Sequence, residues 1–270
     1  MLATIDFTLS EGQFNLVFNV FSLVTAAMGA AAVGFLLVRN RVAPRHRLAL
    51  TLSTLVVGIA TYHYVRITDS WKEAFAFVDG RYVPTDTPFN EGYRYADWLL
   101  TVPLLLAELV IVLALAKKLQ TQLLVKLVGA ATLMIVLGYP GEVADTDSAA
   151  KWIFFALSMA PFLYLLYVLY TQMGEALARQ SERVRQLFSM LRLTILVTWM
   201  VYPLAFLAPY LSLADGTTEV MRQVGYGLAD LVAKPAFGIV LYLIARQKSV
   251  EEGYDADNEG QPAPRVTAAA

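Results

Sequence analysis

Residues 222–245 read RQVGYGLADLVAKPAFGIVLYLIA, a long apolar stretch with Asp230 and Lys234 near its middle. A helix that crosses a hydrocarbon core of about 30 Å needs about 20 residues, and this stretch is long enough. Six other apolar stretches of comparable length precede it, at residues 13–38, 47–67, 93–116, 121–140, 151–172 and 187–212. The sequence therefore predicts an all-α membrane protein, a bundle of seven transmembrane helices.

The overall composition supports a lipid environment. Of 270 residues, 57% are hydrophobic and 16% are charged, whereas a soluble domain has about 25% charged residues. The absence of Cys excludes disulfides and thiolate metal sites, and two His make a histidine metal centre improbable. The net charge of −1 gives no reason to expect nucleic acid as a partner.

Charges in the loops predict the orientation. Basic residues gather in alternate loops and at the start of the tail, at Arg39, Arg41, Arg45, Arg47, Lys117, Lys118, Arg179, Arg183, Arg185, Arg246 and Lys248. The remaining loops are acidic, with Asp6, Glu11, Asp69, Glu73, Asp79, Asp86, Glu91, Glu142, Asp145, Asp147, Asp215 and Glu219. Because positive loops stay in the cytoplasm, the N-terminus is expected outside and the C-terminus inside.

Two segments outside the helices have a character of their own. The loop between the second and third helices contains FAFVDGRYVP (residues 75–84), in which Asp79 and Gly80 separate two aromatic and β-branched runs. This pattern predicts a β-hairpin. Residues 251–270 are acidic and rich in Gly, Pro and Ala, so we expect a disordered cytoplasmic tail after a transmembrane domain of residues 1–250.

Ionisable residues inside a span are costly, and they indicate function by default. Lys234 lies one helical turn from Asp230, on the same face. Helical spacing alone leaves two interpretations open. The two residues form an ion pair that holds helices together, or the lysine is a desolvated amine that reacts with a carbonyl group.

The third span, RYADWLLTVPLLLAELV (residues 94–110), carries two acids. Asp97 and Glu108 are eleven residues apart, close to three turns, so they share a face about 16 Å apart along the axis. Thr101 lies one turn from Asp97, and Arg94 lies one turn on its outer side, where its charge compensates that of Asp97. Two acids stacked inside a bundle are typical of stations on a proton path.

Aromatic residues mark the sixth span, TWMVYPLAFLAPY (residues 198–210). Trp199, Tyr202 and Pro203 fall on one helical face. Taken alone, such a stripe is more often core than cofactor pocket. Pro203 is expected to kink the helix.

Taken together, the third-span motif, the WxxYP of the sixth span and the DxxxK of the seventh resemble the microbial rhodopsins over nearly the whole chain. The resemblance implies all-trans retinal on Lys234 as a protonated Schiff base. It further implies Asp97 as counterion and proton acceptor, Asp230 as second counterion, and Glu108 as proton donor. Arg94 and Thr101 would tune the counterions. The leucines around Glu108 would keep it neutral.

The resemblance also implies a retinal pocket lined by Trp98, Leu105, Met134, Gly138, Phe155, Ser158, Trp199, Tyr202, Pro203 and Phe206. Leu105 matches the green-absorbing proteorhodopsin type. YHYVRITDSW (residues 62–71) is similar to the xanthorhodopsin branch, in which a histidine at the position of His63 hydrogen-bonds the counterion.

At two positions the chain departs from the family pattern. Some xanthorhodopsins admit an antenna carotenoid through a gap left by a glycine of the fifth helix. Here Phe155 stands at that position, in KWIFFALSMAPFLY (residues 151–164), so a carotenoid is not expected. Archaeal pumps release the proton from a pair of carboxylates near the outer surface, and here Arg222 occupies the matching place in the seventh helix, so early release is not expected.

The resemblance therefore predicts a light-driven outward proton pump, not an enzyme, in a bacterial inner membrane. The same resemblance predicts a homo-oligomer of three or five subunits. The alternative is a retinal photosensor that signals to a partner protein, and Glu108 favours the pump because a sensor does not need fast reprotonation. Asp97 and Glu108 differ from the residues of chloride and sodium pumps. Lys234 with Asp230 disfavours a receptor or transporter that lacks retinal.

Overall fold

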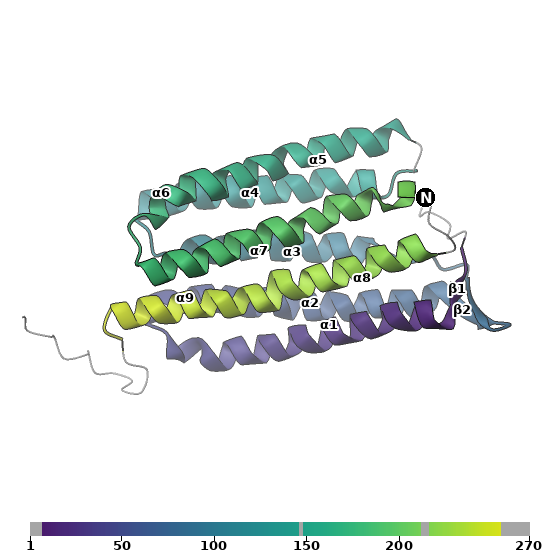
Figure 1. Cartoon of the computed structure of the whole chain (residues 1–270), viewed down its shortest axis with the longest axis horizontal. Coiled ribbons are helices and arrows are strands. Elements are labelled where there is room, and N and C mark those ends of the chain that lie inside the picture. The colour runs from purple at the N-terminus through teal and green to yellow at the C-terminus, as the bar shows by residue number, and fades with distance from the viewer. Residues whose placement is uncertain (1–6, 146–147, 212–215, 255–270) are drawn as a thin grey trace, which may run out of the picture.

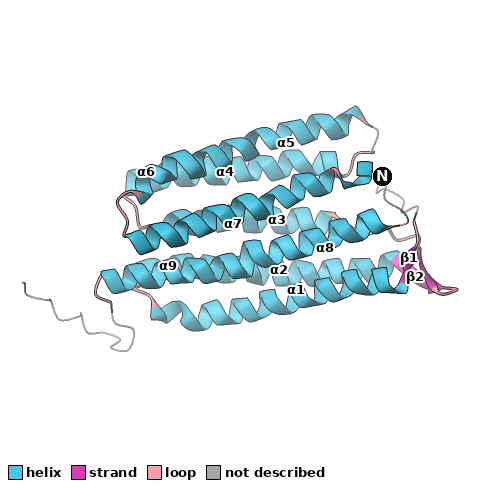
Figure 2. Cartoon of the chain, in the orientation of Figure 1, coloured by secondary structure: helices cyan, strands magenta, loops and turns pink. Residues whose placement is uncertain are grey.

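The computed structural model describes residues 7–145, 148–211 and 216–254, apart from the side chains of Glu175, Pro209 and Leu211. Helices make up nearly all of the described chain, as Figure 2 shows. Their bounds are α1 Glu11–Val38, α2 Arg47–Ala74, α3 Gly92–Ile111, α4 Lys117–Glu142, α5 Ala149–Tyr167, α6 Met173–Leu177, α7 Glu182–Phe206, α8 Thr217–Leu231 and α9 Phe237–Glu251.

These elements form a bundle of seven membrane-length helices, as predicted, because two pairs of elements are continuous. A π-helical segment, Val168–Gln172, joins α5 to α6, and a second one, Val232–Ala236, joins α8 to α9. Within the described chain, six of the seven helices are long and apolar enough to cross a membrane. The remaining helix, α3, carries three buried ionisable residues, Arg94, Asp97 and Glu108, which lower its mean hydropathy.

The predicted bounds of the third and fourth spans were wrong by a few residues. The third was expected to end at residue 116, but α3 ends at Ile111, and α4 begins at Lys117 rather than at residue 121. The physical reason is a tight turn between them, in which Ala114 has a φ of +48°. An L-residue in this left-handed region cannot continue a right-handed helix.

The predicted hairpin is present. Strands β2 (Phe75–Val78) and β3 (Arg81–Pro84) pair antiparallel, with Phe77 opposite Tyr82. The turn residues Asp79 and Gly80 have φ values of +49° and +83°, as a two-residue turn of this hand requires. A short strand that the sequence did not predict, β1 (Leu9–Ser10), pairs with β3, so the sheet order is β1-β3-β2.

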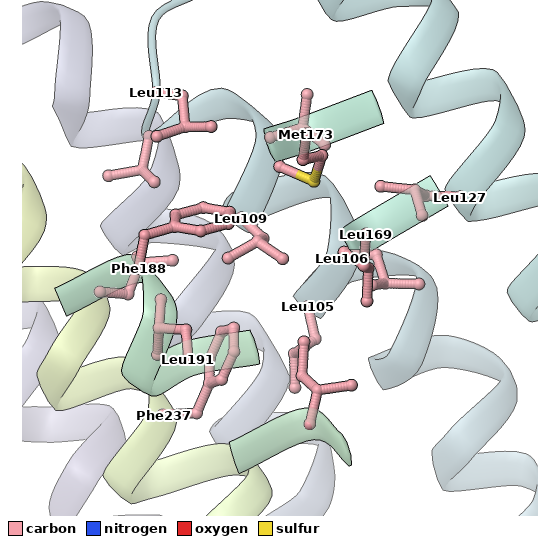
Figure 3. Packing of buried hydrophobic residues seen from close by; sticks show 14 of the residues in the cluster. Leu105, Leu106, Leu109, Leu113, Leu127, Leu169, Met173, Phe188, Leu191 and Phe237 are labelled. Atoms are coloured by element: carbon pink, nitrogen blue, oxygen red, sulfur yellow. The ribbon is translucent and has the colours of Figure 1, made fainter. Parts of the chain in front are cut away.

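The two ends of the bundle differ. Figure 1 shows the sheet and the start of α1 at one end, and the end of α9 at the other. The core of the second end is apolar, and in Figure 3 Leu105 and Leu109 of α3 pack near Phe188 and Leu191 of α7. Large apolar side chains also face outward, including Leu37, which is 75% exposed, as expected for a surface in lipid.

The predicted tail, residues 251–270, lies mostly outside the described residues. In its first residues, α9 continues to Glu251, and Tyr254 donates a hydrogen bond to the carbonyl of Asn40 (3.0 Å). The expectation of disorder for residues 255–270 falls on the part of the chain that the structure does not describe.

Candidate functional site

Lys234 lies at the centre of the bundle, on the π-helical segment between α8 and α9. It is followed by Pro235, which has no backbone N–H and therefore interrupts the regular hydrogen-bond ladder of the helix. The side chain of Lys234 is only 3% exposed. Its Nζ lies 2.5 Å from Asp97 Oδ2 and 3.1 Å from Asp230 Oδ2, so the amine bridges two carboxylates.

Asp230 has hydrogen-bond donors on both oxygens. The Tyr64 hydroxyl donates to Oδ2 (2.8 Å), and the Tyr202 hydroxyl donates to Oδ1 (2.6 Å). Tyr64 comes from α2 and Tyr202 from α7, so three helices meet at this carboxylate. Two donated hydrogen bonds and an amine stabilise the ionised form of Asp230.

Asp97 is less completely satisfied. Its Oδ2 accepts from Lys234, but its Oδ1 has no hydrogen-bond partner among the described residues. The Nδ1 atom of His63 is 3.7 Å from Oδ1, longer than a hydrogen bond, and lies closer to the carbonyl of Ile59 (3.1 Å). The Thr101 hydroxyl donates to the backbone carbonyl of Asp97 (2.8 Å), not to its carboxylate. His63 and Thr101 thus lie beside Asp97, but neither donates a hydrogen bond to its carboxylate.

Arg94 lies on the sheet side of this site and is almost fully buried. Its Nη1 atom donates to the Tyr64 hydroxyl (3.4 Å), its Nε is 3.3 Å from Glu91 Oε2, and its guanidinium also donates to Gln223. Arg94 is therefore linked to Asp230 by hydrogen bonds through the Tyr64 hydroxyl rather than by a direct ion pair.

An ionic cluster, consisting of Glu91, Glu142, Glu219, Arg222 and Gln223, closes the sheet end of the bundle. Arg222 is 3.0 Å from Glu91, 2.7 Å from Glu142 and 2.8 Å from Glu219. The amide of Gln223 donates to Glu91 (2.5 Å) and Glu219 (2.7 Å). Burial raises the pKa of Glu91, which precedes α3, and the charges of Arg222 and Arg94 oppose that rise.

Arg222 was expected to replace a release carboxylate, and the structure shows it bound by three glutamates. Sequence reasoning missed the roles of Glu91 and Gln223. A polar residue one position after Arg222, inside an apolar span, was the available signal.

A largely apolar cavity of about 890 Å³, its open mouth included, lies beside Lys234. All ten predicted pocket residues line this cavity: Trp98, Leu105, Met134, Gly138, Phe155, Ser158, Trp199, Tyr202, Pro203 and Phe206. Sequence reasoning did not identify eight further lining residues: Tyr95, Val102, Ile135, Glu142, Met159, Phe162, Tyr226 and Ala233. Most of these eight follow the helical spacing of predicted neighbours, which was a usable signal.

The wall of this cavity is closely packed where α4 and α5 form it. A Cβ at Gly138 would lie 3.2 Å from Ser158 Oγ, so a larger residue there would press on the opposite wall. The Phe155 ring stacks on that of Phe206, with centroids 4.6 Å apart and planes at 18°. A mostly apolar and aromatic cavity with one buried amine fits a long conjugated aldehyde, because the chain needs apolar walls and the carbonyl needs an amine.

Glu108 is buried on α3, in the apolar end of the bundle, and is 1% exposed. Its Oε2 is 2.7 Å from the Ser53 hydroxyl of α2, which is also 3.3 Å from the carbonyl of Ala49. The described residues include no cation paired with Glu108, nor any group of three acids or histidines that could hold a metal ion.

Comparisons with known proteins identify the family of this chain. The sequence matches the bacteriorhodopsin-like protein family over residues 16–248. It is 34% identical to the green-light absorbing proteorhodopsin of Gamma-proteobacterium EBAC31A08 over 230 residues, 85% of this chain and 86% of the relative.

Two solved structures are similar over 94% of this chain and 100% of their own. One is xanthorhodopsin, described as a light-driven ion pump with dual chromophore, with 48% identity and a TM-score of 0.87. The other is thermophilic rhodopsin, with 49% identity and a TM-score of 0.88. The family consists of ion pumps rather than catalytic enzymes, and it implies retinal as the cofactor. The chain belongs to the bacteriorhodopsin-like family and is a microbial rhodopsin, a membrane protein that crosses the bilayer several times.

Proposed function

We propose that this protein is a light-driven outward proton pump. The observation that carries the proposal is the different surroundings of the two acids of α3. Asp97 contacts the amine of Lys234, whereas Glu108 is hydrogen-bonded to a serine in an apolar setting. Eleven residues of helix separate them, about 16 Å along the axis, which places one acid beside the amine and the other toward the far surface.

Retinal is the cofactor that we propose for the cavity, bound to Lys234 as a protonated Schiff base. When bound, it supplies light absorption and a light-driven change in the direction and acidity of the proton at that nitrogen. The residues that would hold it are the cavity lining, chiefly Trp98, Trp199, Tyr202 and Phe206. The ionised Asp97 and Asp230 would stabilise the positive charge at the Lys234 nitrogen.

Asp97 is the better proton acceptor of the two counterions. The Lys234 Nζ atom, which carries the proton, is 2.5 Å from Asp97 Oδ2, and Asp97 has a second oxygen without a hydrogen-bond partner among the described residues. Asp230, in contrast, already accepts hydrogen bonds from two tyrosines, and these would be weakened if it took up the proton. A movement of the His63 ring by less than 1 Å would bring Nδ1 within hydrogen-bond distance of Asp97, and we expect this histidine to tune the acceptor.

Glu108 is suited to return a proton to the centre. An ionised carboxylate without a partner cation is costly in an apolar interior, so the neutral form is favoured at rest. The Ser53 hydroxyl donates to Glu108 Oε2 (2.7 Å) and also lies 3.3 Å from the Ala49 carbonyl. Both the neutral carboxyl and the carboxylate have an oxygen that accepts this bond, so Ser53 can stay hydrogen-bonded to Glu108 before and after it gives up its proton.

The loop charges support an outward direction, with the sheet outside and the end of α9 in the cytoplasm. The pump would reside in a bacterial inner membrane as a trimer or pentamer, and the exposed leucines and valines would contact lipid and neighbouring subunits. A photosensor is less well supported, because Glu108 and Ser53 form a donor site that sensing does not require.

The direct test is the pH of the medium around illuminated cells that express the protein. With retinal supplied, we expect light to acidify the medium, and a protonophore to abolish the change. Cells that express the Asp97→Asn variant serve as the control and should give no acidification. Light-driven alkalinisation, or no pH change from a protein that absorbs visible light, would contradict outward pumping.

Replacing Lys234 by alanine should abolish the visible absorption band of the protein purified with retinal. The variant loses the buried amine that lines the cavity. Lys151→Ala is the matched control, since Lys151 is also buried and lies 4.7 Å from the ring of the cavity residue Phe206. We expect a full band from the control and only free retinal from the Lys234 variant. A red-shifted band in Lys234→Ala would show that retinal attaches elsewhere.

Glu108→Gln should leave the dark absorption spectrum nearly unchanged and slow the return of the proton to the Lys234 nitrogen by about 10²-fold. The reason is that glutamine cannot give up a proton, although it still accepts the Ser53 hydrogen bond. Flash spectroscopy measures the rate, and added azide, a small proton carrier, should partly restore it. Ser53→Ala is the companion variant and should slow the same step less. Normal kinetics in Glu108→Gln would exclude the donor role.

We further propose that no antenna carotenoid binds, because the Phe155 ring fills the wall of the cavity against Phe206. The excitation spectrum of the protein with added lutein or zeaxanthin should therefore lack carotenoid bands. Phe155→Gly should admit the carotenoid, at a cost in stability of up to about 3–5 kcal/mol. Carotenoid bands in the excitation spectrum of the wild type would mean that Phe155 moves aside.

A further inference from the structure

The buried face of α2 carries polar groups at three levels of the bundle. Tyr64 and His63 lie at the level of Asp230 and Asp97, and Ser53 lies at the level of Glu108. His46 immediately precedes α2 at the end opposite the sheet, and it is 0% exposed. The first two levels serve the pump that we propose. The third has no role so far.

His46 is paired on one side only. Its Nε2 lies 2.8 Å from Glu252 Oε1, just beyond the end of α9, where the Glu252 side chain is 24% exposed. Its Nδ1 is buried and has no hydrogen-bond partner among the described residues. A carboxylate that accepts from Nε2–H fixes the tautomer in which Nδ1 is free to accept a proton.

The charged groups around this pair come from two elements. Arg45, in the same loop, donates a hydrogen bond to Glu252, and its Nε lies 3.4 Å from His46 Nε2. Lys248 of α9 donates a hydrogen bond to Gln180 (2.6 Å). Burial lowers the pKa of His46, the contact with Glu252 opposes this shift, and the two cations add to it. These opposing effects suit a group that gains a proton and gives it up again.

The route from His46 to Glu108 is short and apolar. Ser53 is seven residues from His46, so it shares the same face of α2, about 10.5 Å further along the axis. Between them, this face carries the buried Ala49 and Leu50. Ser53 is in turn hydrogen-bonded to Glu108 (2.7 Å). Water would have to enter this gap for a proton to pass, and the apolar side chains there disfavour its entry.

We propose that His46, with Nε2 held by Glu252, is the group that takes up a proton from the cytoplasm and passes it through Nδ1 to Glu108. This inference rests on the proposed function, because it assumes that Glu108 must be reprotonated from that side.

The proton balance is simple. Neutral His46 gains at Nδ1 a proton that entering water carries in from the cytoplasmic surface, and it becomes an imidazolium, whose charge Glu252 stabilises through Nε2–H. The imidazolium then gives the Nδ1 proton, along water that has entered the gap, to the ionised Glu108. His46 returns to its starting tautomer, and Glu108 becomes neutral. No other group changes its charge.

A purely structural role is the competing interpretation. Other contacts already join α9 to the first loop, since Ser249 accepts from the Ala43 amide (2.8 Å) and Tyr254 accepts from Arg47 (3.1 Å). His46 and Glu252 would then only add to this junction.

The test follows light-induced proton uptake on the cytoplasmic side of the full-length, retinal-loaded protein, with a pH-indicator dye and flash spectroscopy. The variants are His46→Gln, His46→Ala and Glu252→Gln, and the last keeps an oxygen that accepts from Nε2–H. Glu251→Gln is the matched control, because Glu251 is the neighbouring carboxylate and bonds to Gln247 instead (2.8 Å).

We expect the His46 variants to slow proton uptake at least about tenfold, within what a positioned acid–base group contributes. Glu252→Gln should slow it less, Glu251→Gln should not slow it, and transfer from Glu108 to the centre should keep its rate in all four variants. Added imidazole should accelerate uptake in His46→Ala and not in the wild type.

Normal uptake in His46→Gln, or a slowing that imidazole fails to relieve in His46→Ala, would overturn the proposal, as would a lowered melting temperature as the only effect. Failure of the proposed function would look different, because the wild type itself would then show no light-induced uptake.

Discussion

The contact that the rest of the structure depends on is the bridge of the Lys234 amine to Asp97 and Asp230. A charge in an apolar interior is tolerated only if it is paired, and here one cation lies between two acids. The surrounding residues serve this arrangement. Two tyrosines satisfy Asp230, Arg94 balances the second negative charge through Tyr64, and the π-helical segment at Pro235 places the lysine.

From this centre the two ends of the bundle are built differently. Toward the sheet, the interior is polar. A chain of hydrogen bonds and ion pairs runs from Arg94 through Gln223 to the three glutamates around Arg222. Toward the opposite end, the interior is apolar between the Lys234 site and Glu108, and it is apolar again between Glu108 and His46. A polar outer half and an apolar inner half suit the outward pumping that we propose, because a proton moving outward would meet polar acceptors and a proton moving back would meet an apolar barrier.

The helix α2 connects these levels. It supplies Tyr64 to Asp230, Ser53 to Glu108 and, at its start, His46 to Glu252. Asp230, Asp97 and Glu108 each have a partner or a near neighbour on this helix. A shift of α2 relative to the helices around it would therefore change all three levels together.

The sequence by itself determined much of this protein, because lipid imposes simple rules on a chain. Length and hydropathy predicted the helices, Asp79-Gly80 predicted the hairpin, and intramembrane charges identified Lys234, Asp97, Asp230 and Glu108. The tertiary structure alone decided which neighbours those charges have: Tyr64 and Ser53 as partners, the glutamates around Arg222, and strand β1, whose two residues carry no pattern. The physical reason is that these contacts join helices far apart in the chain, and their geometry depends on how whole helices pack.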